Sequence, residues 1–162
     1  MEGGFQIDPA RTSEDLAAVE RLFTEYAKSL DVDLKYQNFD DELAGLPGVY
    51  AAPAGELLLA RMSCGEPIAC VGMRRLRNKT CEMKRLYVAA GGRGLGLGRA
   101  LVRRIALAAA DSGYTKIVLD TLPSMHSAQS LYRAEGFSEI EPYYDTPITG
   151  TVFMARAIRP GE

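Results

Sequence analysis

Cysteine is scarce in this sequence and shows no recognisable pairing pattern. The three cysteines, Cys64, Cys70 and Cys81, are odd in number, and none belongs to a C-x-x-C pair. This spacing argues against a disulfide framework and against a zinc site, so we expect reduced thiols and no metal. The first residues lack a basic segment followed by an apolar run, which is the mark of a secretory signal. A cytoplasmic location is therefore expected.

Charge of one sign and long hydrophobic runs are also missing. The formal net charge is −2, whereas a nucleic-acid groove or a surface attracted to anionic lipid needs a basic excess. No segment approaches the roughly 20 apolar residues that span a bilayer. We therefore expect neither nucleic acid nor a membrane as a partner. Hydrophobic residues make up 47% of the chain and charged residues 25%, which is typical of a soluble globular protein.

What the sequence does contain is regular hydrophobic spacing, which predicts a single α/β (α+β) domain over residues 1–162. Its mixed central sheet is expected to have about seven strands, flanked by about four helices. Strands are expected at 5–8, 56–62, 67–76, 80–88 and 116–121, followed by two antiparallel strands that end by 158. Helices are expected at 13–30, 40–46, 97–112 and 123–136. The first strand is typical of a sheet edge, and the apolar strand 116–121 of a sheet interior.

A cluster of glycines lies between strand 80–88 and helix 97–112. Its members are Gly91, Gly92, Gly94, Gly96 and Gly98. A helix N-terminus carries free N–H groups and partial positive charge, and glycine lets the backbone approach an anion closely. The loop therefore predicts a phosphate site, with a ligand-free surface loop as the alternative. Leu97 stands where a Walker loop needs lysine, and Arg99 where a dinucleotide-binding loop needs glycine, so both of those motifs are excluded.

The same loop matches the pattern (Q/R)-x-x-G-x-(G/A) through Arg93, Gly96 and Gly98. This pattern resembles the pyrophosphate signature of the GNAT N-acetyltransferases. Two further segments are similar to that family. Segment 82–88 resembles its central strand, and segment 128–137 resembles its A-x-x-L-Y-x-x-x-G-F helix. The resemblance is to a small, bacterial-type member of the GNAT superfamily.

The resemblance implies acetyl-CoA as a co-substrate. In the family, the central strand parts from its neighbour and pairs its backbone with the pantetheine arm, which assigns Leu86 and Val88 to that arm. It also implies that the Val88 N–H faces the thioester carbonyl. The other residues that the resemblance assigns to the co-substrate are Arg93, Gly94, Gly96, Gly98, Arg99 and Ser130. Met125 departs from the family, because many relatives carry asparagine at this position.

Acetyl transfer to an amine needs a base, because an amine with a pKa of about 10.4 is mostly protonated at neutral pH, and an acid for the departing thiolate. The resemblance implies Tyr132 as the acid, and the alternative is a core aromatic residue. Glu82 is the candidate base, because a carboxylate in a buried strand is costly without a task or a partner. The alternative is an ion pair with Lys84 or with a neighbouring strand. Strand alternation places Glu82 and Lys84 on one face, and Cys81 and Arg85 on the other.

The expected function is an acetyl-CoA-dependent N-acetyltransferase in which a primary amine attacks directly in a ternary complex. Candidates for the acceptor site are Tyr26 and segments 34–39 and 143–145, whose aromatic residues could instead pack the core. A small amine or an amino acid is expected as the acceptor. A non-catalytic acyl-CoA-binding sensor or scaffold stays open as an alternative, as does a protein or peptide N-acetyltransferase. A sheet edge could form a homodimer.

Overall fold

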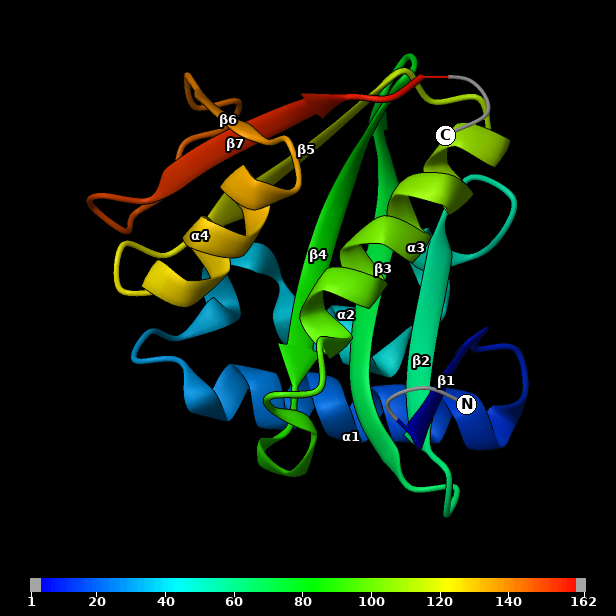
Figure 1. The fold of residues 1–162 in the computed structure, drawn as a ribbon. Coiled ribbons are helices and arrows are strands. Elements are labelled where there is room, and N and C mark those ends of the chain that lie inside the picture. Colours follow the sequence, from blue (N-terminus) through cyan, green and yellow to red (C-terminus); the bar gives the residue numbers. More distant parts are fainter. Residues whose placement is uncertain (1–3, 160–162) are drawn as a thin grey trace.

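The computed structural model describes residues 4–159, which form a mixed seven-stranded sheet with helices on both faces (Figure 1). The strands are β1 (Phe5–Pro9), β2 (Glu56–Met62), β3 (Pro67–Arg77), β4 (Thr80–Val88), β5 (Lys116–Thr121), β6 (Ser138–Ile140) and β7 (Val152–Ala157). The helices are α1 (Ser13–Ser29), α2 (Phe39–Ala44), α3 (Leu97–Asp111) and α4 (His126–Ala134), with short 3-10 turns η2 (Leu34–Gln37), η3 (Gly48–Tyr50) and η4 (Ala90–Gly92). The strand order is β1-β2-β3-β4-β5-β7-β6. The predicted fold class and order of elements are confirmed.

Helix α1 begins at a capping box and covers one face of the sheet. The Asp15 N–H donates to the Thr12 hydroxyl at 3.0 Å, and the Asp15 carboxylate accepts from the Thr12 N–H at 3.2 Å. Val19, Leu22 and Phe23 then recur at helical spacing and are fully buried. They belong to a hydrophobic cluster that includes residues of β2 and β3. Burial of this apolar stripe holds the helix on the sheet.

Helix α3 covers the opposite face (Figure 1). Leu101 and Ile105 are fully buried in a second hydrophobic cluster, together with Ile117 and Leu119 of β5. The sheet is thus buried on both faces, as the unbroken apolar run in β5 predicts. Within residues 4–159, no helix is both long enough and apolar enough to cross a membrane.

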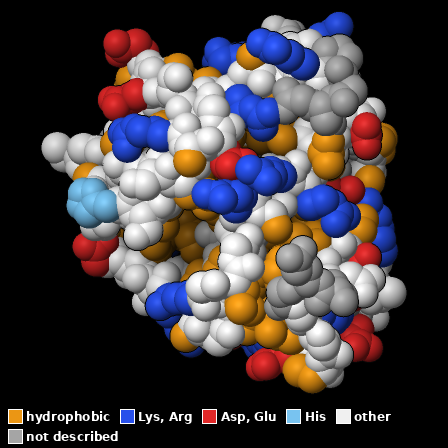
Figure 2. Space-filling view, viewed as in Figure 1, with side chains coloured by type: hydrophobic (Ala, Val, Ile, Leu, Met, Phe, Trp, Pro, Cys, Tyr) orange, Lys and Arg blue, Asp and Glu red, His pale blue; other side chains and the backbone are white. Residues whose placement is uncertain are grey.

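The sheet opens between β4 and β5. These strands pair in parallel only where Thr80–Glu82 lies beside Lys116–Val118. Beyond these pairs the two strands diverge, and α3 and α4 flank the gap (Figure 1). Figure 2 shows a hollow with a hydrophobic floor between α4 and the start of α3, with Lys and Arg side chains nearby. The unpaired half of β4 therefore borders an accessible space.

A bulge interrupts β4 at Arg85, which has a φ of 63°. The pairing with β3 shifts between Cys70 and Gly72, where β4 carries one extra residue. Such an insertion reverses the alternation of side chains. Arg85 and Lys84 consequently share a face, and both donate to the Gln37 Oε1. The prediction that Arg85 points to the opposite face was wrong, because alternation holds only in an unbroken strand.

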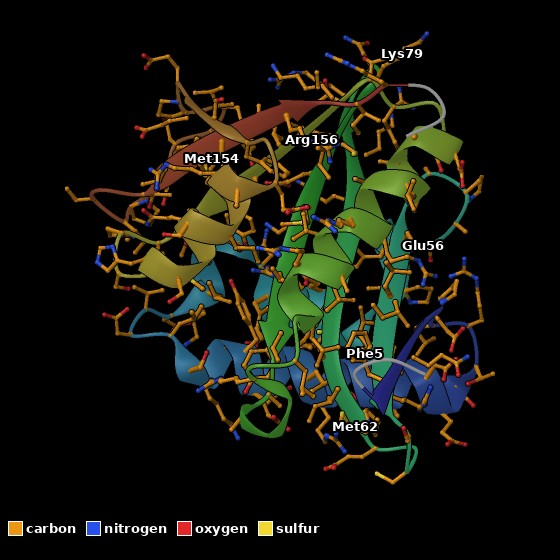
Figure 3. The ribbon with its side chains drawn as sticks, in the orientation of Figure 1. Phe5, Glu56, Met62, Lys79, Met154 and Arg156 are labelled. Carbon is orange, nitrogen blue, oxygen red and sulfur yellow. The ribbon has the colours of Figure 1, made fainter. Side chains whose placement is uncertain are left out.

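Both edges of the sheet are formed by short strands. Phe5 of β1 lies opposite Met62 of β2 (Figure 3), which confirms the predicted edge strand. At the other edge β6 has only three residues, so the connection to β7 is longer than the sequence indicated. Helix α4 begins at His126 rather than at 123, because the Met125 N–H closes a turn onto the Leu122 carbonyl at 3.0 Å.

Candidate active site

A cavity, which we name the inner cavity, lies between the diverging parts of β4 and β5. Its lining includes Tyr26, Lys84, Leu86, Asp120, Thr121 and Tyr132. Thr121 is 5% exposed, and its Oγ1 has no hydrogen-bond partner within residues 4–159. A buried hydroxyl without a partner is costly and rare in native proteins. The Thr121 hydroxyl is therefore a group that a polar atom inside the inner cavity could bond.

The backbone of β4 presents amide groups to the gap. The Ala89 N–H donates to the Ile68 carbonyl of β3 at 2.9 Å, and successive backbone groups of a strand point to opposite sides. The N–H and C=O of Val88 therefore point away from β3, toward the gap. The same alternation turns the Leu86 backbone to that side. Both residues lie beyond the last pair of β4 with β5, at Glu82, so an extended ligand could pair with this edge.

The glycine loop leads directly into the N-terminus of α3, as predicted. Gly94 and Gly96 have φ values of 84° and 77°, with no atom within 4 Å of an added Cβ. Glycine adopts this conformation without strain. Gly96 is the N-cap of α3, and no side chain caps the helix. The free N–H groups of the first turn are therefore available to an anion.

The other predicted co-substrate residues differ in their exposure and in the contacts that they already make. Arg93 is exposed and makes no ion pair within the described part of the chain. Arg99 is 57% exposed and lies 3.5 Å from the Glu135 carboxylate. Gly98 faces α4, where an added Cβ would lie 3.1 Å from a leucine side chain. Ser130 is exposed on α4. Arg93 is thus the cation most available to a ligand here.

Tyr132 comes from α4 and lines the inner cavity. Its ring packs against that of Phe137, with 5.8 Å between the two ring centroids. Burial raises the pKa of Tyr132, so the phenol stays protonated at neutral pH. The hydroxyl makes no hydrogen bond to another residue in the range 4–159. Tyr132 is therefore both a packed aromatic residue and a protonated group beside the cavity.

A larger hollow, which we name the outer cavity, adjoins the inner cavity and has a volume of about 630 Å³. Its lining includes Tyr36, Tyr50, Arg74, Glu82, Lys84 and Tyr143. The volume is typical of a small-molecule site. The predicted acceptor segments 34–39 and 143–145 both contribute to this lining, whereas Tyr26 lines the inner cavity. Lys84 lines both cavities and marks their junction.

Glu82 lines the outer cavity but is only 1% exposed. Its Oε1 accepts from the Arg74 Nε at 2.8 Å, and its Oε2 accepts from the Tyr143 hydroxyl at 2.5 Å. Both oxygens are therefore engaged. The ion pair considered as the alternative to a catalytic base exists, and its partner is the neighbouring strand β3 rather than Lys84.

Three charged residues of the site escaped sequence analysis. Arg85 donates to both carboxylate oxygens of Glu42, at 2.9 and 3.0 Å. Asp120 accepts from the Tyr144 hydroxyl. The position of Asp120 at the carboxyl end of a buried strand was a usable signal, because ligands of α/β proteins gather at such ends. Arg85 gave no signal, since the bulge that turns it inward is invisible in the hydrophobic pattern.

No cysteine lines the inner or the outer cavity. All three are free, and Cys81 is fully buried. Burial raises the pKa of Cys81 to about 12, so its thiol is not a nucleophile at neutral pH. Within residues 4–159, no three His, Cys, Asp or Glu side chains are grouped so as to hold a metal ion.

Comparisons with known proteins agree with this architecture. The model of the Acetyltransferase (GNAT) family matches residues 16–137. An uncharacterized N-acetyltransferase of Schizosaccharomyces pombe is 40% identical, over 91% of each chain. A GNAT-family acetyltransferase of Staphylococcus aureus has a TM-score of 0.80 at 20% identity, with 96% of this chain and 99% of that chain covered. A putative acetyltransferase of Salmonella typhimurium, solved with acetyl-CoA, has a TM-score of 0.70 at 18% identity, with 96% and 95% covered.

The two solved structures show the fold, and the family model and the yeast relative show the family. The opened sheet, the uncapped glycine helix and Tyr132 are thus features of a chain that belongs to the GNAT family of acetyltransferases.

Proposed function

We propose that this chain is an acetyl-CoA-dependent N-acetyltransferase, in which a primary amine attacks the thioester directly in a ternary complex. The observation that carries the proposal is the inner cavity. It opens between β4 and β5, it is lined by Tyr132, and it holds the unpartnered Thr121 hydroxyl. Family membership and the acetyl-CoA bound by the Salmonella relative support the choice of co-substrate.

The chain's groups fit this co-substrate along the β4 edge and the start of α3. The backbones of Leu86 and Val88 would pair with the pantetheine arm. The groups proposed to hold the rest of the molecule are those of Arg93, Gly94, Gly96, Gly98, Arg99 and Ser130. When bound, acetyl-CoA supplies the activated acetyl group. The Val88 N–H would then donate to the carbonyl oxygen as negative charge develops there.

Tyr132 is proposed as the acid. In the transfer, the amine nitrogen forms a bond to the acetyl carbon, the carbon–sulfur bond breaks, and the sulfur takes the phenolic proton. The proton that the neutral amine loses as the amide forms passes through water to the phenolate, which restores the phenol. A phenol with no internal hydrogen bond is suited to this exchange, because its hydroxyl is free to donate to the thiolate as it forms.

For Glu82, the geometry favours the ion pair over the base. A base must be free to accept a proton, and both oxygens of Glu82 already accept from Arg74 and Tyr143. Glu82→Gln should then destabilise the fold while the pH profile of kcat/KM keeps its shape. If the variant instead lost the increase of kcat/KM with rising pH, Glu82 would return to the role of base.

The acceptor is proposed to be a small amine or an amino acid, bound in the outer cavity. A volume of about 630 Å³ encloses a molecule of this size. A peptide acceptor would need an open groove, and a sensor would bind acetyl-CoA without turnover. Tyr132 beside the inner cavity favours the enzyme over the sensor.

Thermal denaturation with acetyl-CoA, coenzyme A and ATP as a control nucleotide tests the co-substrate. Ligand at about 100 times its dissociation constant adds about 2.7 kcal/mol to the free energy of unfolding. We expect stabilisation by both coenzyme A forms, followed by thiol release when a panel of amines is added. No stabilisation at millimolar ligand would overturn the co-substrate. Stabilisation without thiol release for any amine or peptide would favour the sensor.

A further inference from the structure

The ionic groups around the two cavities divide into closed pairs and single charges. Arg74 is paired with Glu82, with 2.8 Å between nitrogen and oxygen. Arg85 is paired with Glu42 at 2.9 Å. Within each pair the positive and the negative charge neutralise each other, so neither pair leaves a cation or an anion without a partner. They form the fixed part of the site.

Lys84 is a cation left over from this pairing. Its Nζ donates only to the Gln37 Oε1, at 3.4 Å, and no carboxylate of residues 4–159 lies within 4 Å of it. Burial lowers the pKa of Lys84, while the carboxylates of Glu82 and Asp120 act to raise it. The Lys84 side chain is half-buried, and an ammonium with one long hydrogen bond has room for a further, oppositely charged partner. Because Lys84 lines both cavities, the missing partner can come from a ligand at their junction.

Asp120 is the anion left over. Its Oδ2 accepts from the Tyr144 hydroxyl, and its Oδ1 has no donor within the described chain. Asp120 forms no ion pair, and it lines the inner cavity together with Tyr132. The remaining carboxylate of the outer lining, Asp41, is exposed to solvent. The inner site therefore holds one unpaired positive and one unpaired negative group that do not meet each other.

We propose that the acceptor is an amino acid, with its ammonium group bound by Asp120, its carboxylate bound by Lys84 and its side chain in the outer cavity. This inference rests on the proposed N-acetyltransferase function. A zwitterion supplies the opposite charge to each unpaired group in one molecule, which a simple amine cannot do. Asp120 takes the nitrogen end because it lines only the inner cavity, beside Tyr132, whereas Lys84 lies at the junction with the outer cavity. The aromatic walls of the outer cavity suit an apolar side chain.

Binding to the full chain saturated with coenzyme A tests the proposal. The probes are matched sets: phenylalanine, its amide and phenylethylamine, then leucine, its amide and isopentylamine. We expect the amino acid to bind at least about 30-fold more tightly than its amide or its amine, which is the worth of one charge-assisted hydrogen bond. Equal dissociation constants across a set would overturn the proposal.

Two variants of Lys84 and one control assign the effect. Lys84→Met should abolish the preference for the amino acid, and Lys84→Arg should restore part of it. Lys79→Met is the matched control, because Lys79 is exposed in the hairpin at the far end of β4 (Figure 3), and should keep the full preference. A preference that persists in Lys84→Met would overturn the proposal. If that variant does not fold, the wild-type series decides alone.

Acetyl transfer to the same compounds separates this proposal from the function on which it rests. Transfer to amino acid and amine with equal kcat/KM would leave the N-acetyltransferase in place and overturn the zwitterion site. Tight binding of amino acids without thiol release would uphold the zwitterion site and overturn the transferase.

Discussion

The hydroxyl of Tyr132 has no partner in the described chain, whereas that of Tyr114 donates to the Ala54 carbonyl at 2.6 Å. The proposed role of Tyr132 as the acid depends on this difference between the two buried tyrosines. A hydroxyl bonded inside the protein contributes to stability, and one left free beside a cavity can serve a ligand.

Tyr132→Phe is expected to lower kcat by about 100-fold, because it removes only the proton donor. Affinity for coenzyme A should stay near normal, as should the melting temperature. Tyr114→Phe is the control and should do the reverse, losing about 1 kcal/mol of stability and no activity. Steady-state thiol release, coenzyme A titration and thermal melts measure the three quantities. Normal turnover of Tyr132→Phe would remove its role as the acid.

At the scale of elements, α1 shows how a local motif sets a pH response. The Arg11 N–H bonded to Asp15, together with the Thr12 N–H and hydroxyl and the Arg61 side chain, lowers the pKa of that carboxyl from 3.8 to about 2. Because folding lowers this pKa, the carboxylate stabilises the protein fully above pH ~4, the unfolded value. That contribution is lost as the pH falls toward the folded pKa of about 2.

Asp15→Asn should therefore remove about 1 kcal/mol at neutral pH and flatten the loss of stability between pH ~4 and ~2. The expected loss is small because the Asp15 carboxylate stays partly exposed. Glu14→Gln, which removes the same charge from the same turn but no cap, should keep the acid-side slope. Urea unfolding at stepped pH gives the comparison. An unchanged slope in Asp15→Asn would mean that the capping box does not titrate in this range.

The glycine loop allows a matched comparison of backbone and ligand effects. Gly96 and Gly65 have positive φ values of 77° and 95°, and an added Cβ meets no atom within 4 Å at either position. Alanine at each should cost about 1 kcal/mol of stability through backbone strain. Only Gly96→Ala should also weaken coenzyme A binding, since Gly65 lies in the β2–β3 turn. Equal affinities of the two variants for coenzyme A would argue against a phosphate site at α3.

At the scale of the whole molecule, few residue pairs join β4 to β5. A ligand bound in the gap between these strands should therefore protect the backbone amides of β4 that face it. The Val88 N–H faces the gap, whereas the adjacent Ala89 N–H is bonded to Ile68. Coenzyme A should slow hydrogen exchange at Val88 by at least about 10-fold, with little further effect at Ala89. Exchange measured by NMR with and without ligand resolves the two amides. Equal change at both would mean general stabilisation rather than pairing with β4.

The sequence alone predicted the order of strands and helices, the glycine loop before α3 and the alternation that places Glu82 and Lys84 toward the same cavity. These features follow from local rules. Hydrophobic period, capping and turn chemistry each depend on residues within a few positions of one another. The resemblance to the family rested on the same local patterns, so it located Tyr132 on α4 before its surroundings were known.

Only the tertiary structure decided which charges are paired. Glu42 and Arg85 meet across 43 residues of sequence, and a single inserted residue in β4 turns Arg85 toward Glu42 rather than away. Many cations could satisfy a given carboxylate, and nothing local selects among them. The fold closed two pairs and left Lys84 and Asp120 without partners, because ionic contacts depend on distances that the packing of remote elements sets. The proposed preference for a zwitterionic acceptor follows from these two unpaired charges.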